Sequence, residues 1–202
     1  MKYLYTFFIL ASSLFSLSVH AQQPEPAYSG WSWSGHVEHM NFDDDKAWEQ
    51  GIADSATAIG FAAERYTNTS DNTLSLGMSF IFYNDDDEFA QYVEDYWGDT
   101  DYAESDANAI SIFAEYGPKI RWGADRLSFF TARGGISGML YSERGIGNCS
   151  DCYSEDIDIN GGLYGVLGVG RTTGSIDWSL QFQQYFTGDI DNVIRLKISG
   201  AF

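Results

Sequence analysis

The chain has 202 residues and a formal net charge of −18, with 16% aromatic residues, 21 glycines and only three prolines. The excess of acid excludes nucleic acid as a natural partner, because phosphate backbones are bound by clustered lysine and arginine. Beyond residue 19 no stretch approaches the ~18 to 20 continuous apolar residues of a transmembrane helix. The composition instead favours a protein of many strands with tight corners.

The N-terminus has the plan of a cleavable secretory signal. A positive charge precedes an apolar and hydroxyl-rich run, and the small residues Val19 and Ala21 occupy the −3 and −1 positions of a cleavage site. A single membrane anchor is the alternative, but the run is short for spanning and polar sequence follows it. We therefore expect a cleaved signal at 1–21, a short periplasmic segment at 22–28 and one domain at 29–202.

Eight segments of the mature chain alternate between apolar and polar residues, which indicates strands with one apolar and one polar face. Pro118 lies inside the fourth segment and predicts a bulge or the end of that strand. In the fifth, regular alternation places Tyr141 on the polar face. In chain order the segments cover about 29–42, 55–67, 73–83, 107–121, 127–141, 159–171, 175–186 and 191–202.

The length of these segments separates two fold classes. Strands of soluble proteins usually have ~5–6 residues, whereas a tilted strand needs ~9–11 to cross a bilayer. The connections at 43–54, 84–106 and 142–158 are long, and those between them are short and rich in turn-forming residues. Because outer-membrane barrels pair short periplasmic turns with long external loops, the sequence predicts an all-β, up-and-down antiparallel transmembrane β-barrel of eight strands.

The charged residues divide between loops and strands. Most of the acidic residues fall in the expected external connections, including the runs at 43–45 and 85–88. Ionisable residues on the polar strand faces would lie inside the barrel, where buried charges must be paired. A polar pathway or a catalytic cluster is the alternative to a structural ion-pair network that plugs the interior. The residues of this expected network are His36, Glu38, Glu64, Glu115, Lys119, Arg121, Arg133, Asp177, Arg195 and Lys197.

The whole mature chain resembles the small outer-membrane barrels of the OmpA transmembrane-domain and OmpX/Ail type in strand number, loop alternation and length. Its final strand alternates and ends in an aromatic residue, similar to the signal that the barrel-assembly machinery recognises, although Gly200 stands where an apolar residue is usual. The residues of this expected signal are Ile194, Leu196, Ile198 and Phe202. The resemblance implies a role in envelope integrity, adhesion or host interaction.

Two motifs could carry chemistry. Cys149 and Cys152 lie in the third long loop, where we expect a disulfide of an exported protein. Metal binding and thiol chemistry are the alternatives, but a zinc site needs about four ligands and no histidine lies nearby. His39 is expected on the outer face near the external leaflet, where a lipid A acyl hydrolase could use it, but the His-x-Ser arrangement of that family is absent.

Aromatic residues toward the strand ends, such as Trp31, Trp122 and Trp178, predict girdles at the two membrane interfaces, with carbohydrate stacking as the alternative. We expect a non-enzymatic barrel of the bacterial outer membrane, without catalytic residues, cofactor or specific metal site. It would serve envelope structure or surface interaction through acidic external loops. Its expected partners are membrane lipid, lipopolysaccharide, the barrel-assembly machinery and divalent cations bridging at those loops. A lipid A-modifying enzyme and a narrow channel remain the alternatives.

Overall fold

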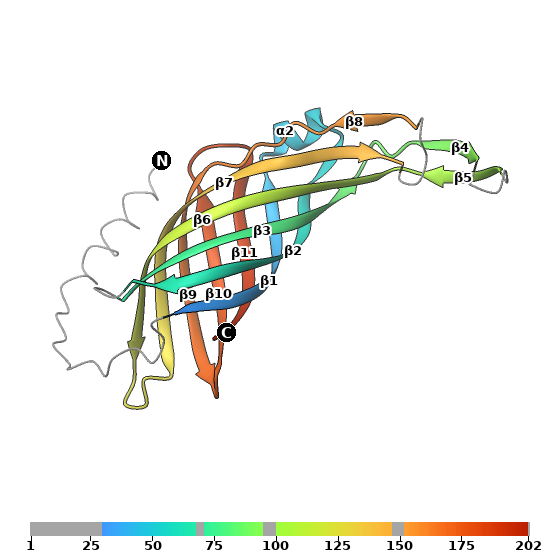
Figure 1. Ribbon diagram of the computed structural model, residues 1–202. Coiled ribbons are helices and arrows are strands. Elements are labelled where there is room, and N and C mark those ends of the chain that lie inside the picture. The colour runs from blue at the N-terminus through green and yellow to red at the C-terminus, as the bar shows by residue number, and fades with distance from the viewer. Residues whose placement is uncertain (1–29, 68–70, 95–99, 147–151, 202) are drawn as a thin grey trace.

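The computed structural model describes residues 30–67, 71–94, 100–146 and 152–201 (Figure 1). The expected signal at 1–21 and the segment at 22–28 lie outside these residues. Eight long antiparallel strands form a closed barrel, which confirms the predicted fold class. They are β1 (Trp31–Phe42), β2 (Ile52–Tyr66), β3 (Asn72–Asp85), β6 (Asp106–Trp122), β7 (Ser128–Gly145), β9 (Leu163–Thr173), β10 (Ile176–Tyr185) and β11 (Ile190–Ala201).

Neighbouring barrel strands follow one another along the chain, and the ring closes between the first and the last. The order is β6-β3-β2-β1-β11-β10-β9-β7, with a further pairing of β6 with β7. The closing pair of β1 and β11 runs from Ser32 opposite Ala201 to Phe42 opposite Ile190. Closure leaves no barrel edge unpaired, as a strand structure in lipid requires.

Alternation along each strand separates the two faces of the barrel wall. On β1 the even-numbered residues from Ser32 to Phe42 are buried, whereas Trp31, Trp33 and Val37 are exposed. The outer surface of the wall is therefore apolar, while the opposite face of each strand points into the lumen, the interior of the barrel. In the part of the chain that the structure describes, no helix is long and apolar enough to cross a membrane.

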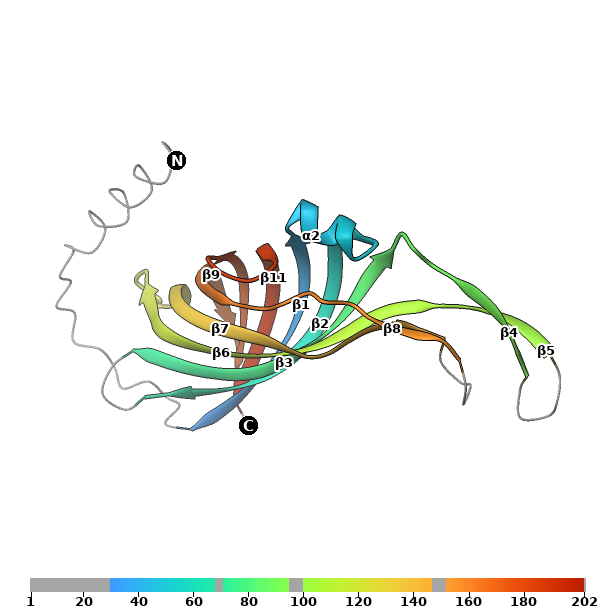
Figure 2. The ribbon, with the colours of Figure 1, turned by 90° about the horizontal axis from the view of Figure 1, so that it is seen from above.

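The two ends of the barrel differ in their connections. At one end, which we call the turn end, the strands are joined by short turns such as Gly174-Ser175, where Gly174 has a φ of +63°. The other end, the loop end, carries the helix α2 (Asp44–Glu49), the hairpin of β4 (Ala90–Glu94) and β5 (Thr100–Glu104), and β8 (Ser154–Asp156). Figures 1 and 2 show this hairpin as an arm that projects away from the barrel.

Two details of strands β6 and β7 correct the sequence predictions. Pro118 neither ends β6 nor shifts its register, because Tyr116 opposite Gly134 and Lys119 opposite Thr131 keep the same offset on either side of it. The irregularity lies further along, where Ile110 faces Tyr141 but Ser111 faces Met139. Because of the extra residue at this bulge, the side chains that follow it on β7 point to the opposite face from the one that regular alternation predicts. Tyr141 is consequently 44% exposed on the outer face.

The sixth strand begins later than the sequence predicts. β9 starts at Leu163 rather than at 159, and the preceding loop places Ile157 and Ile159 in a buried apolar cluster. This cluster fills the lumen near the loop end and includes α2 through Ala47. The lumen is therefore apolar toward the loop end and polar below it. The inward residues of the cluster include Met40, Phe42, Ile81, Tyr83, Val166 and Val193.

Candidate functional site

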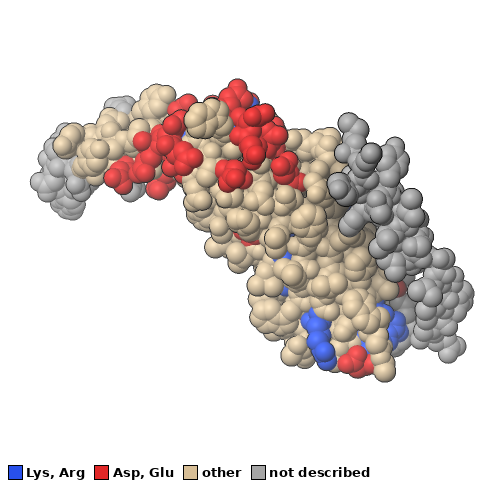
Figure 3. Space-filling view, turned by 180° about the vertical axis from the view of Figure 1, so that it is seen from behind, with Lys and Arg blue, Asp and Glu red and all other residues tan. Residues whose placement is uncertain are grey.

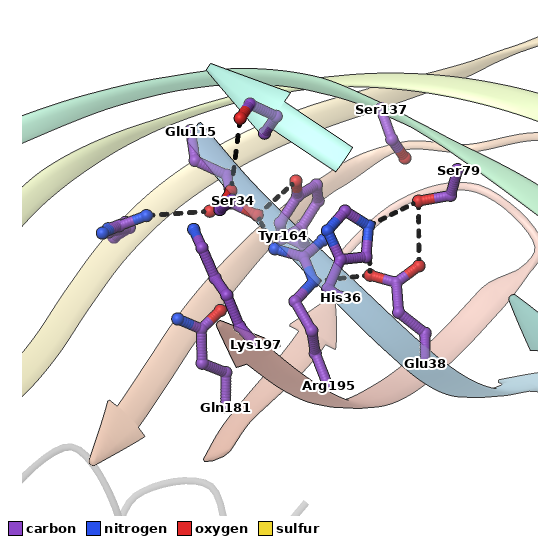
Figure 4. Close-up of polar contacts among 12 residues, drawn as sticks. Ser34, His36, Glu38, Ser79, Glu115, Ser137, Tyr164, Gln181, Arg195 and Lys197 are labelled. Carbon is purple, nitrogen blue, oxygen red and sulfur yellow. Dashed lines mark hydrogen bonds and ion pairs between the residues drawn. The ribbon is translucent and has the colours of Figure 1, made fainter. Parts of the chain in front are cut away.

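Six charged side chains meet in the middle of the lumen and form what we call the central cluster: Glu38, Glu64, Glu115, Arg133, Arg195 and Lys197. Figure 4 labels four of them, Glu38, Glu115, Arg195 and Lys197. Arg195 links two carboxylates, with Nε 2.5 Å from Glu38 Oε1 and NH1 2.6 Å from Glu115 Oε1. Arg133 NH1 lies 2.9 Å from Glu64 Oε1 and 3.4 Å from Glu115 Oε2. Lys197 Nζ lies 2.5 Å from Glu64 Oε1. Three acids therefore meet three bases.

Neutral polar side chains complete this cluster. The Tyr164 hydroxyl donates to Glu115 Oε1 at 3.1 Å, and Ser79 Oγ donates to Glu38 Oε2 at 3.1 Å. His36 Nε2 lies 3.0 Å from Ser79 Oγ. Because the serine proton is directed to Glu38, His36 acts as the donor toward Ser79. A nucleophilic serine needs the reverse arrangement, with its proton passed to histidine.

A second group, the mouth cluster, lies at the turn end of the lumen and contains Lys119, Arg121, Thr172 and Asp177. Asp177 Oδ2 lies 2.5 Å from Lys119 Nζ and 3.2 Å from Arg121 NH2. Thr172 Oγ1 accepts from Arg121 NH1 at 2.6 Å and donates to Asp177 Oδ1 at 2.5 Å. The structure thus divides the ten predicted interior residues between two groups, with His36 beside the central cluster.

Arg144 is a further buried cation, outside both clusters and not predicted from the sequence. Its Nε donates to both carboxylate oxygens of Asp85, at 2.7 and 2.8 Å. Its NH2 donates to the carbonyls of Gln50 and Gly51, at 3.0 and 2.8 Å. Arg144 therefore ties the α2 connection to the ends of β3 and β7. Regular alternation would have placed it outside, and only the bulge near Leu140 turns it inward.

The remaining predicted residues fall on the outer face or outside the described chain. Ile194, Leu196 and Trp178 are exposed on the wall, where the membrane would contact them. Cys149 and Phe202 lie outside the described residues, so the disulfide with Cys152 and the aromatic end of the assembly signal stay predictions.

His39 faces outward, as the alternation indicated. The residues directly opposite it on the neighbouring strands are Thr57 and Ile194. Neither of these side chains is a carboxylate that could orient an imidazole for hydrolysis.

Acidic side chains gather at the loop end and along the start of the arm, and basic side chains are seen at the turn end (Figure 3). Glu88, at the base of the arm, faces the like charge of Glu104, which raises the pKa of the Glu88 carboxyl. On α2, the hydrogen bond to Glu49 raises the pKa of Lys46. No group of three or more metal-ligating side chains was found among the residues that the structure describes.

A closed eight-stranded wall, apolar outside and ion-paired inside, is the architecture of a small transmembrane β-barrel. At the level of the fold, this confirms the resemblance to the small OmpA and OmpX-like barrels. No protein-family model and no curated protein matches the chain. Among solved structures, Neisserial surface protein A is similar, with a TM-score of 0.48 and 12% identity over 86% of this chain and 98% of that chain.

Proposed function

We propose that the chain is an integral, non-enzymatic barrel of the bacterial outer membrane that serves envelope structure or surface interaction through its acidic loops. The observation that carries this proposal is the division of side chains among three environments. Apolar side chains cover the wall, ion pairs occupy the lumen below an apolar layer, and acidic side chains gather at the loop end. A filled lumen supports a structural role over a channel, since an eight-stranded barrel leaves little space beyond its own side chains.

The loop end would face the outside of the cell. Even strand number and short turns at one end support this orientation, because the short turns of outer-membrane barrels face the periplasm. The acidic surface would then meet lipopolysaccharide through divalent cations, and other molecules at the cell surface directly. Insertion would require the barrel-assembly machinery, with Ile194, Leu196, Ile198 and Phe202 as its signal.

Location and orientation can be tested together on whole cells. Trp48 on α2 is 87% exposed at the loop end, and Asp125 lies in a turn at the other end. We expect Trp48→Cys to react with a membrane-impermeant thiol reagent on intact cells, and Asp125→Cys to react only after the outer membrane is opened. Recovery of the protein in the soluble periplasm, without a heat-dependent shift in gel migration, would contradict the barrel. The reverse labelling pattern would contradict the orientation.

Channel and enzyme functions give different signals in two further measurements. The purified protein should produce no stable ionic conductance in planar bilayers, since paired side chains occupy the lumen. Overexpression should leave the acyl chains of lipid A unchanged in mass spectra. A lost or transferred acyl chain that returns to normal in His39→Ala would favour the enzyme, and stable conductance would favour the channel.

A further inference from the structure

The lumen contains a cavity of about 40 Å³ at the turn end. Charged and hydroxyl side chains line it, among them Glu64, Tyr66, Lys119, Arg121, Asp177 and Ser199. We propose that this cavity binds a small oxyanion, a carboxylate or a phosphate, that enters from the turn end. The proposal does not depend on the role of the loops, because it uses only side chains at the opposite end of the barrel.

The balance of charge at the turn end favours an anionic ligand. In the central cluster three carboxylates meet three cations. In the mouth cluster Lys119 and Arg121 share a single carboxylate, Asp177. Glu64 also lines the cavity, but its carboxylate is paired with Arg133 and Lys197 of the central cluster. Counted over the cavity and the two clusters that border it, one positive charge remains in surplus. Electrostatic attraction is stronger there than in water, because the surroundings are less polarisable. The surplus favours an anion over a cation as the ligand.

Lys119 and Arg121 are held in place but keep N–H groups that can donate to a ligand. The side chain of Lys119 is only 5% exposed, and its Nζ lies 4.3 Å from the centre of the Phe129 ring. An ammonium group carries three donors, and one carboxylate contact uses one of them. The side chain of Arg121 is 29% exposed, so an incoming anion can reach its planar fork of N–H groups, a geometry that suits oxyanions.

Two buried hydroxyl groups lie on strands whose neighbouring residues line the cavity. Thr73 and Thr131 are each 1% exposed, and their Oγ1 atoms have no hydrogen-bond partner among the described residues. In register, Thr73 lies opposite Tyr66 and Thr131 lies opposite Lys119, both of which line the cavity. Because buried hydroxyls are almost always hydrogen-bonded, these two are groups that a polar ligand in the cavity, or water beside it, would satisfy.

The binding test uses the full chain in detergent micelles. Inorganic phosphate and acetate would be titrated separately at constant ionic strength against chloride, while unfolding in urea is followed by tryptophan fluorescence. A ligand that binds only the folded state raises the unfolding midpoint with its concentration. We expect a saturable increase with phosphate or with acetate, and the anion that saturates at the lower concentration identifies the preferred chemistry. The absence of a saturable increase with either anion overturns the proposal.

Variants separate a site from general charge effects. Arg121→Gln should weaken binding at least about ten-fold, as expected for one lost charge-assisted hydrogen bond. Lys119→Met should abolish binding, but it alters a buried pair and could unfold the barrel, so Arg121→Gln carries the test. Arg171→Gln is the matched control, since Arg171 lies on β9 at the same end with its side chain 65% exposed. Equal weakening in the control and in Arg121→Gln would overturn the site.

Discussion

Arg195 and Glu115 form an ion pair across the full width of the barrel. Their NH1 and Oε1 atoms lie 2.6 Å apart, although β11 and β6 are separated by β1, β2 and β3 on one side and by β10, β9 and β7 on the other. The two strands are therefore opposite each other in the ring. This pair is a direct cross-link through the lumen, and backbone pairing of neighbouring strands cannot replace it.

Glu115→Gln should therefore be strongly destabilising despite its similar shape. The Glu115 side chain is fully buried and contacts Arg195, Arg133 and Tyr164. Removing one partner of a buried ion pair leaves an uncompensated charge and typically costs about 3–5 kcal/mol. Urea unfolding in detergent would measure the loss, with Glu49→Gln on exposed α2 as the control that stays close to wild type. An unchanged urea midpoint for Glu115→Gln would show that the ion pair across the lumen does not stabilise the barrel.

Alternation along the strands was sufficient to predict the barrel, because lipid and lumen select opposite side chains at every second residue. It also placed residues such as Glu115 and Arg195 on the inner face, where the structure has them. The predicted up-and-down order already makes the fourth and the eighth strand, β6 and β11, opposite in the ring. The pairing of Glu115 with Arg195 was not predicted, because the register of the strands decides which residues meet at the same height in the lumen.

Arg144 and Tyr141 show where alternation fails. One extra residue near Leu140 inverts the faces of the rest of β7, so the aromatic side chain turns outward and the cation turns inward. No residue type marks this bulge in the sequence. The apolar layer at the loop end was also missed, because Ile157 and Ile159 enter it from a loop that has no strand period.

Gly60 should not tolerate a side chain. A Cβ at this position would collide with His36 Nε2 and with the backbone carbonyl oxygen of Met78. Overpacking of this kind costs about 1–3 kcal/mol, so Gly60→Ala should lower the urea midpoint. Gly138→Ala on β7 is the control, since a Cβ there meets nothing within 4 Å. Equal stability of the two variants would contradict the close approach of His36 to the β2 backbone.

Arg144→Met should destabilise the connections at the loop end without opening the barrel wall. The variant leaves Asp85 and the carbonyls of Gln50 and Gly51 without their donor. Hydrogen exchange should accelerate in the 50–51 segment and at the end of β3, but not in β10 or β11. Arg144→Lys should rescue only in part, because an ammonium cannot make the paired contacts of a guanidinium. If Arg144→Lys restored the wild-type exchange rates in full, the positive charge of Arg144 alone, without its paired contacts, would hold the loop end together.

The arm should be more ordered in mild acid than at neutral pH. The like charge of Glu104 raises the pKa of Glu88, so protonation of Glu88 favours the folded hairpin. This stabilisation is present at low pH and is lost as the pH rises through the raised pKa. The contacts that depend on it are at the base of the arm, where Ser105 N donates to the Phe89 carbonyl at 2.8 Å and Phe89 N donates to Ser105 Oγ at 3.0 Å.

Amide exchange in β4 and β5, corrected for the intrinsic rate at each pH, would measure this effect. Lowering the pH from about 7 to about 5 should increase protection in the wild-type protein, because a carboxyl whose pKa is raised takes up its proton within that range more readily than an ordinary glutamate. Glu88→Gln should show the higher protection already at neutral pH, since its amide carries no charge. Glu49→Gln, at the same end of the barrel but on α2, should behave as wild type. If Glu88→Gln showed the same pH response as the wild-type protein, the pH-dependent protection would come from another carboxylate of the loop end and not from Glu88.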